Sequence, residues 1–160
     1  MTELLRGLPP IIDSAAGTLI LGSFPSEASL AARQYYGHRQ NQFWRLLGAL
    51  LEVPLAEMDY AARKAALHRA GIAVWDVYAS CERAGSLDSA IRGVQANDFG
   101  RLKKLAPDLQ RVRFNGRTAA RFERHLNELG YATRMLPSSS PAYTLAFEKK
   151  LAAWRAALRS

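Results

Sequence analysis

The sequence lacks the features that mark several specialised classes of protein. With one cysteine, Cys81, it has no internal disulfide, no four-cysteine iron–sulfur cluster and no cysteine-rich zinc site. No apolar run reaches membrane-spanning length, and no basic N-terminal stretch precedes a long apolar core. We therefore expect a cytoplasmic protein that makes no contact with membranes. Repeats, low-complexity tracts and linkers are also missing, so we expect a single domain over residues 1–160.

Acidic residues are few relative to basic ones. The chain has 22 Lys and Arg against 14 Asp and Glu, which gives a net charge of +8. One interpretation is a solvated basic surface without a function. The other is attraction to a polyanion through contacts with phosphate groups. Charge alone does not decide between these two interpretations.

The common nucleotide-binding and catalytic signatures are absent too. The chain has no Gly-x-Gly-x-x-Gly fingerprint, no Gly-Lys-Ser/Thr phosphate loop and no Gly-x-Ser-x-Gly nucleophile elbow. His38, His68 and His125 are not spaced as metal ligands, and we expect His68 and His125 at the surface or at helix ends.

What the sequence does contain is an alternation of apolar runs and amphipathic segments. Helices are predicted over 41–52, from a cap at Asp59 to Ala70, over 86–91, from a cap at Asn97 to a point before Pro107, over 117–129 and over 147–158. Buried strands are predicted at Thr18–Leu21, Ile72–Val77, Val112–Asn115 and Tyr131–Leu136. Such alternation is typical of α/β proteins with a mostly parallel sheet covered on both faces.

Polar residues follow each predicted strand. Gly22, Asp76, Asn115 and Ser138 lie at or just beyond the carboxyl ends of the strands. Because these ends share one edge of a parallel sheet, we expect the four loops to line one crevice. A crevice rich in hydroxyl and amide groups, with Phe24 in its first loop, suits a flat polar ligand such as a nucleobase.

Five motifs, taken together, resemble a known family. They are GSFPS from Gly22, YYGHRQNQFW from Tyr35, SCERAGSLDSAI from Ser80, FNG from Phe114 and LPSSSPAY from Leu136. In this order they resemble the uracil-DNA glycosylase superfamily, most closely its hypoxanthine-DNA glycosylase group. The resemblance implies a three-layer α/β/α sandwich around a mostly parallel four-stranded sheet, with no metal and no cofactor. It also implies an enzyme that flips a deaminated base out of double-stranded DNA and hydrolyses its N-glycosidic bond, initiating base excision repair. We expect a monomer that associates with the nucleoid when it acts.

The resemblance also assigns roles to single residues. The uracil branch has an Asp in its first loop that assists water attack, but Phe24 stands at that position here. The hypoxanthine group uses an Asn of the second motif, and Asn41 matches it, although Arg39 stands where the family commonly has Pro. Asn41 is therefore the expected catalytic residue, whose side-chain carbonyl would hold the attacking water. The expected base-binding residues are Gly22, Ser23, Phe24, Ser26, Tyr36, His38 and Asn115, and the expected DNA contacts are Ser138, Ser139, Ser140 and Tyr143.

Two substitutions relative to the uracil branch favour hypoxanthine over uracil. Ser26 stands where that branch has a Tyr that walls the pocket, so the pocket is expected to be wider. Leu136 replaces its His, which leaves no imidazole to stabilise the departing base. Xanthine and uracil stay open as further substrates.

Several alternatives remain at this point. Asn41 is also a good helix cap, Asn115 a good turn residue, and the three serines a polar surface loop. Asp76, Glu27 and Asp88 are further carboxylates, any of which is a candidate base. Two functions stay open besides that of a DNA glycosylase: an α/β enzyme acting on free nucleotides, and a non-catalytic DNA-binding relative.

Overall fold

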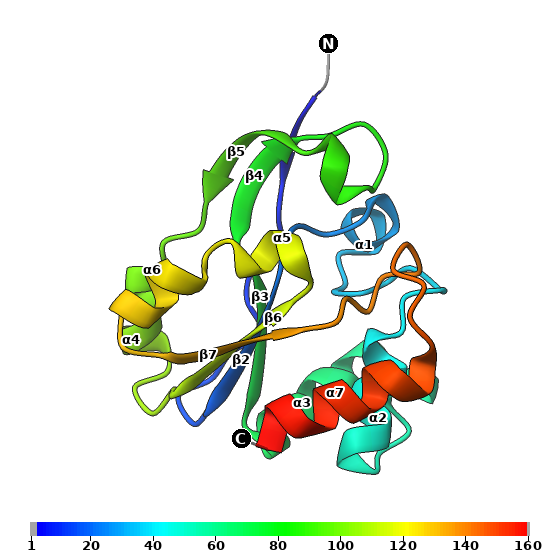
Figure 1. Cartoon of the computed structure of the whole chain (residues 1–160), viewed down its shortest axis with the longest axis vertical. Coiled ribbons are helices and arrows are strands. Elements are labelled where there is room, and N and C mark those ends of the chain that lie inside the picture. Colours follow the sequence, from blue (N-terminus) through cyan, green and yellow to red (C-terminus); the bar gives the residue numbers. More distant parts are fainter. Residues whose placement is uncertain (1–2, 160) are drawn as a thin grey trace.

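The computed structural model describes residues 3–159 and shows a parallel sheet with helices on both faces (Figure 1). Its four strands are β2 (Thr18–Gly22), β3 (Ile72–Asp76), β6 (Arg111–Asn115) and β7 (Ala132–Leu136). They are ordered β3-β2-β6-β7, and each neighbouring pair is parallel. The predicted strands and the parallel sheet are confirmed. β2 and β3 are buried at every position, which explains why both appear in the sequence as continuous apolar runs.

Side chains that alternate along the strands divide the core into two halves. Leu19 and Leu21 of β2 face one cluster, whereas Ile20 between them faces the other. The first cluster packs beneath η3 (Phe99–Arg101), α4 (Leu102–Leu105), α5 (Arg117–Ala120) and α6 (Glu123–Glu128). The second packs beneath α2 (Phe43–Leu51), η1 (Leu55–Glu57), α3 (Tyr60–Ala70) and α7 (Phe147–Arg159). This is the three-layer α/β/α sandwich that the sequence predicted.

A second, smaller sheet was not predicted. β1 (Leu4–Arg6), β4 (Tyr78–Glu82) and β5 (Arg92–Ala96) form an antiparallel sheet in the order β1-β4-β5, drawn at the top of Figure 1. The segment after Val77, for which no strand was predicted, is therefore a strand. Every residue of β5 is exposed, so no apolar alternation marks it, and pairing with β4 makes it a strand.

Helix ends follow the local sequence closely, with some corrections. The Asp59 carboxylate accepts from the Ala62 N–H at 2.8 Å, and Gly71 ends α3 with φ 71°, both as predicted. The residue that caps η3 is Asp98, not the predicted Asn97. Asn and Asp both cap helices well, and here they are adjacent in the sequence. The helix predicted over 117–129 divides into α5 and α6. The turn at 86–91 contains the short 3-10 helix η2 (Asp88–Ala90), and α1 (Glu27–Ala32) was not predicted.

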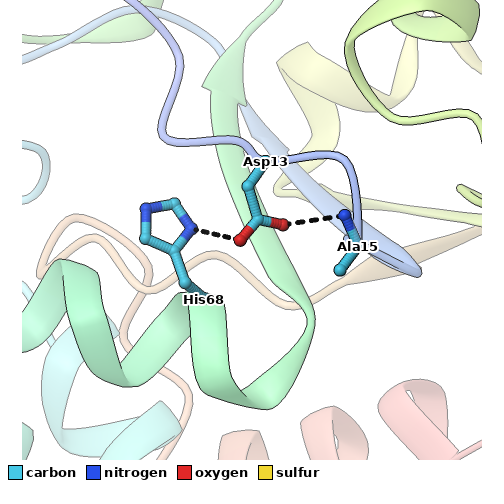
Figure 2. A network of polar contacts seen from close by, with 3 residues as sticks. All are labelled: Asp13, Ala15 and His68. Atoms are coloured by element: carbon cyan, nitrogen blue, oxygen red, sulfur yellow. Dashed lines mark hydrogen bonds and ion pairs between the residues drawn. The ribbon is translucent and has the colours of Figure 1, made fainter.

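His68 fastens the amino-terminal segment to the last turn of α3, at the amino end of the sheet (Figure 2). Its Nδ1 lies 3.3 Å from Oδ2 of Asp13, whose Oδ1 accepts from the Ala15 N–H at 3.0 Å. Both side chains of the pair are partly exposed, so the contact stabilises the fold by at most about 1 kcal/mol. His125 is an exposed residue of α6. Both histidines thus have the helical surface positions expected for them.

Residues 3–159 contain no helix that is long and apolar enough to cross a membrane. Within the same range, no three His, Cys, Asp or Glu side chains come together in a way that suits a metal ion.

Candidate active site

A cavity of about 270 Å³ opens at the carboxyl ends of the parallel strands. Figure 1 shows α1, η2 and the loop after β7 at this end of the sheet. Every site residue predicted from the sequence lines the cavity: Gly22, Ser23, Phe24, Ser26, Tyr36, His38, Asn41, Asn115, Ser138, Ser139, Ser140 and Tyr143. Two of the three spare carboxylates, Asp76 and Asp88, line it as well. The expected convergence of the four strand-end loops is therefore confirmed.

Gly22 occupies the most crowded point of the cavity wall. A Cβ atom at this position would lie 2.6 Å from Oδ1 of Asp76 and 2.8 Å from the hydroxyl of Tyr36. Both distances are too short for any side chain, so glycine is required by close approach. Gly22 thus lets the carboxyl group of Asp76 and the phenol of Tyr36 both approach the end of β2.

Tyr36 has a constrained backbone and a packed ring. Its φ is 54°, in the left-handed region that bulky residues rarely adopt. The ring stacks on Phe43 with centroids 3.8 Å apart, and the hydroxyl accepts from Nδ2 of Asn115 at 3.1 Å. Strain of this kind persists only where packing imposes it, and it is common at functional sites. Phe43 and the neighbouring Trp44 are both buried in the second core cluster.

Asn41 lies just before α2 and is half-buried. Its Oδ1 accepts from the Phe43 N–H at 2.9 Å, so the side chain supports the start of α2, although the N-cap residue itself is Gln42. A carbonyl oxygen has two lone pairs, so one acceptor site on Oδ1 is left for a water molecule. This hydrogen bond at the start of α2 and the catalytic role are therefore compatible, and the catalytic role stays a prediction.

Asn115 is held on both sides of its amide group. Its Nδ2 donates to the Tyr36 hydroxyl at 3.1 Å and to Oγ of Ser139 at 2.9 Å, and its Oδ1 accepts from the Ser139 N–H at 2.9 Å. Both amide hydrogens are thereby used. Asn115 is an expected base-binding residue, but in this geometry it has no free N–H to donate to a base. In this geometry the residue positions the loop after β7.

The serine loop divides into a buried and an accessible part. Ser139 is only 1% exposed, and its carbonyl oxygen accepts from the Gln42 N–H at 3.0 Å. Ser139 therefore joins the loop to the start of α2 instead of pointing to solvent, which corrects its expected role as a DNA contact. Ser138 and Ser140 are half-buried, and Tyr143 is 47% exposed at the rim. For these three residues, contact with DNA stays a prediction.

Arg83, which sequence reasoning missed, fixes the first loop. Its Nη2 donates to the Pro25 carbonyl oxygen at 2.7 Å and its Nε to that of Gly85 at 2.7 Å. The guanidinium carbon lies 5.3 Å from the centroid of the Phe24 ring. Phe24 is 7% exposed, so a small part of its ring faces the cavity. Arg83 lies within the third motif, SCERAGSLDSAI, but the motif by itself does not indicate that the guanidinium is buried.

The two carboxylates of the cavity differ in their surroundings. Asp76, the last residue of β3, is 5% exposed, and its Oδ2 has no hydrogen-bond partner among residues 3–159. Burial, and secondarily the charge of Asp88, raise the pKa of Asp76 to about 7, although Arg83 opposes the shift. Asp88 is exposed, and its Oδ1 accepts from Oγ of Ser23 at 2.6 Å. Glu27, the third spare carboxylate, is exposed at the start of α1 and is not among the lining residues.

Comparisons with known proteins agree with this geometry. A family model described as the uracil DNA glycosylase superfamily matches residues 9–159. Proteins named hypoxanthine DNA glycosylase from Methanosarcina barkeri and Methanosarcina acetivorans are each 40% identical to this chain, over 96% of it and 98% of their own length. The solution NMR structure of a candidate uracil DNA glycosylase from Methanosarcina acetivorans is also similar. It has a TM-score of 0.90 and 39% identity, and it covers 98% of each chain.

Proposed function

This chain belongs to the uracil DNA glycosylase superfamily and is a DNA glycosylase, and we propose that its substrate is hypoxanthine in double-stranded DNA. As a DNA glycosylase it hydrolyses an N-glycosyl bond and acts in DNA repair. The substrate is supported by the near-full-length similarity to two proteins named hypoxanthine DNA glycosylase. The observation within the structure that carries the proposal is the small side chain of Ser26 in the cavity wall.

Ser26 leaves room where the uracil branch has a Tyr. Its Oγ is turned to α1, where it lies 2.9 Å from Oγ of Ser29 and accepts from the Ser29 N–H at 3.1 Å. The cavity of about 270 Å³ lies just below the range of drug-sized sites, which suits one flipped base. Leu136, at the position of the uracil-branch His, is fully buried and has no donor to offer. A small side chain at position 26 of the cavity wall and the absence of an imidazole at position 136 favour a purine over uracil.

The proposed reaction is dissociative. The C1′–N bond of the flipped nucleotide breaks with oxocarbenium character, and a water held by the remaining lone pair of Asn41 Oδ1 adds to the sugar. A cation this reactive needs a positioned water more than a strong base. Phe24 stacks on the base, and backbone N–H groups around Ser23 stabilise charge on it. Ser138, Ser140 and Tyr143 face the DNA.

The test is single-turnover cleavage of matched duplexes that carry one hypoxanthine, xanthine, uracil or normal adenine, followed by alkaline scission of abasic sites. Hypoxanthine should be released fastest and adenine not at all. Free deoxyinosine should be inert, because the enzyme draws on contacts with polymeric DNA. Release of free deoxyinosine at the duplex rate would favour a nucleotide enzyme, and no release from any duplex would favour a non-catalytic relative.

Ser26→Tyr tests the pocket itself. The variant should lose far more activity on hypoxanthine than on uracil, because the ring fills the space that the second ring of a purine needs. Ser26 also caps α1, so Ser26→Ala is the matched control: it removes the cap and leaves the wall open. If Ser26→Tyr and Ser26→Ala lose the same activity on both bases, the pocket argument is wrong.

We further propose that the protein acts as a monomer in the cytoplasm, at the nucleoid. One chain supplies all the predicted site residues to a single cavity, which supports this state. Size-exclusion chromatography with light scattering, with and without duplex, should give one protein chain per particle. A dimer in both measurements would contradict it.

A further inference from the structure

A carboxyl group without a donor lies in the wall of the cavity. Asp76 ends β3, is 5% exposed, and has its Oδ2 buried without a partner among the described residues. Its Oδ1 lies against Gly22, where only the absence of a side chain makes room for it. A carboxylate in this position has lost water without gaining a hydrogen bond to that oxygen, so the neutral acid is favoured. A neutral carboxylic acid beside a substrate is a proton donor.

The charges around Asp76 leave the acid form well populated. The titratable groups that act on it or share its surroundings are Tyr35, Tyr36, Tyr60, Arg83 and Asp88. The negative charge of Asp88 disfavours ionisation of Asp76, whereas Arg83 favours it. Arg83, however, directs Nη2 and Nε to backbone carbonyl oxygens. Burial is the largest influence, and it brings the pKa of Asp76 to about 7, so the proton is present in much of the protein at neutral pH.

The proposed reaction needs a proton at the departing base. When the bond between C1′ and N9 breaks, its electron pair goes to the base, and hypoxanthine leaves as an anion unless a ring nitrogen is protonated. Leu136 has no proton to give, and both amide hydrogens of Asn115 are bound to Tyr36 and Ser139. His38 also lines the cavity, but it is exposed and its Nδ1 accepts from the Gln40 N–H at 3.1 Å. Asp76 is the buried carboxyl group of the wall that can supply the proton.

We propose that Asp76 is the general acid of this enzyme and protonates a ring nitrogen of the flipped purine as the glycosidic bond breaks. The inference rests on the proposed function. The carboxyl O–H bond breaks, a base N–H bond forms, and the electron pair of the C1′–N9 bond stays on N9, so hypoxanthine leaves neutral. Water then bonds to C1′, and the proton it loses returns to the Asp76 carboxylate through solvent. The sum is hydrolysis, with one water consumed and the acid regenerated.

The pH dependence of single-turnover cleavage tests this role. With a hypoxanthine duplex, the wild-type rate should fall as pH rises through about 7, because the proton is lost from Asp76. Asp76→Asn should be slower by about 100-fold or more, the usual range for general acid catalysis, and its residual rate should show no fall in this window. A wild-type rate that rises through this window would make Asp76 a base and overturn the proposal. So would an Asp76→Asn variant that cleaves at the wild-type rate.

Two further variants separate catalysis from structure. Asp88→Asn removes a charge that raises the pKa of Asp76, so the falling limb should move to lower pH. Asp108→Asn changes an exposed carboxylate before β6, at the opposite edge of the sheet, and should leave the profile unchanged. Thermal melting checks that Asp76→Asn is folded. If the wild type releases no deaminated base, the proposed function fails; if it does and Asp76→Asn matches it, only this inference fails.

Discussion

The ammonium group of Lys150 donates to Oε1 of Gln42 at 2.9 Å, which joins α7 to the residue that follows Asn41. The same nitrogen lies 3.3 Å from the carbonyl oxygen of Ser140, and Lys150 is only 1% exposed. The Gln42 N–H in turn donates to the carbonyl oxygen of Ser139. One buried cation thus holds together the loop of the predicted catalytic residue and the loop predicted to face DNA.

Lys150→Met should slow cleavage by about tenfold and destabilise the protein by roughly 1–3 kcal/mol. The change keeps most of the side-chain volume but leaves Oε1 of Gln42 without its donor. A displaced Asn41 then positions water less well. Single-turnover rates and denaturant unfolding measure the two effects, and Lys149→Met, at the exposed neighbour, is the control. Normal cleavage by a destabilised Lys150→Met would limit Lys150 to a structural role.

Asn41→Ala should abolish abasic-site formation while binding to duplex DNA stays nearly intact. The loss of the hydrogen bond to the Phe43 N–H should cost on the order of 1 kcal/mol of stability. Asn41→Asp keeps that acceptor and should recover the stability, which separates the cap from the chemistry. If Asn41→Ala melts much earlier yet cleaves at the wild-type rate, Asn41 is a cap and another group positions the water.

Asp76→Asn should stabilise the protein above pH 7. The pKa of Asp76 is about 7 in the folded protein and about 4 in an unfolded chain. Between these values the folded state holds a proton that the unfolded chain has released, so the free energy of unfolding of the wild type falls as pH rises, by on the order of 4 kcal/mol in total. The Asn side chain has no such titration. Urea unfolding at several pH values should show the two proteins converging towards pH 4; a constant difference would contradict the raised pKa.

Two exposed apolar side chains stand at the rim of the cavity, Leu87 at 59% and Tyr143 at 47% exposure. Apolar side chains inserted between base pairs help to unstack DNA. Leu87→Ala and Tyr143→Ala should each reduce the fluorescence rise of a 2-aminopurine placed beside hypoxanthine in a duplex. Cleavage of single-stranded substrate should change little, because no gap has to be filled there. Val94→Ala, equally exposed but outside the cavity lining, is the control; an equal loss in that variant would refute the assignment.

Binding to undamaged duplex should weaken steeply with salt, because each phosphate contact releases counterions. Arg39 and Arg117 are exposed; Arg39 directly follows His38 and Arg117 lies two residues after Asn115, and both His38 and Asn115 line the cavity. Arg39→Ala or Arg117→Ala should each lower the slope of log affinity against log salt by about one. Arg124→Ala, in the exposed pair with Glu128 on α6, should change it little. A flat plot for the wild type would mean that the charge of +8 is only a solvated surface.

Much of the fold was readable from the sequence because its signals are local. The buried strands β2 and β3 are continuous apolar runs, and α3 begins and ends at residues whose side chain or backbone suits a helix end. The exposed strand β5 carries no such signal, because a partner strand far along the chain decides its conformation. The buried position of Lys150 is indicated in the sequence, because this charged residue falls on the apolar face of α7.

The sequence by itself determined which residues line the cavity at the carboxyl ends of the strands. Parallel strands end at one edge, so Gly22, Asp76, Asn115 and Ser138 had to share a cavity once the strands were located. Only the tertiary structure decided what each residue is able to do there. Both amide hydrogens of Asn115 are bound to Tyr36 and Ser139, whereas Asp76 has a buried oxygen that no described residue donates to. Hydrogen-bond partners and burial are set by segments distant along the chain, and they decide whether a polar group holds the fold or remains available to a substrate.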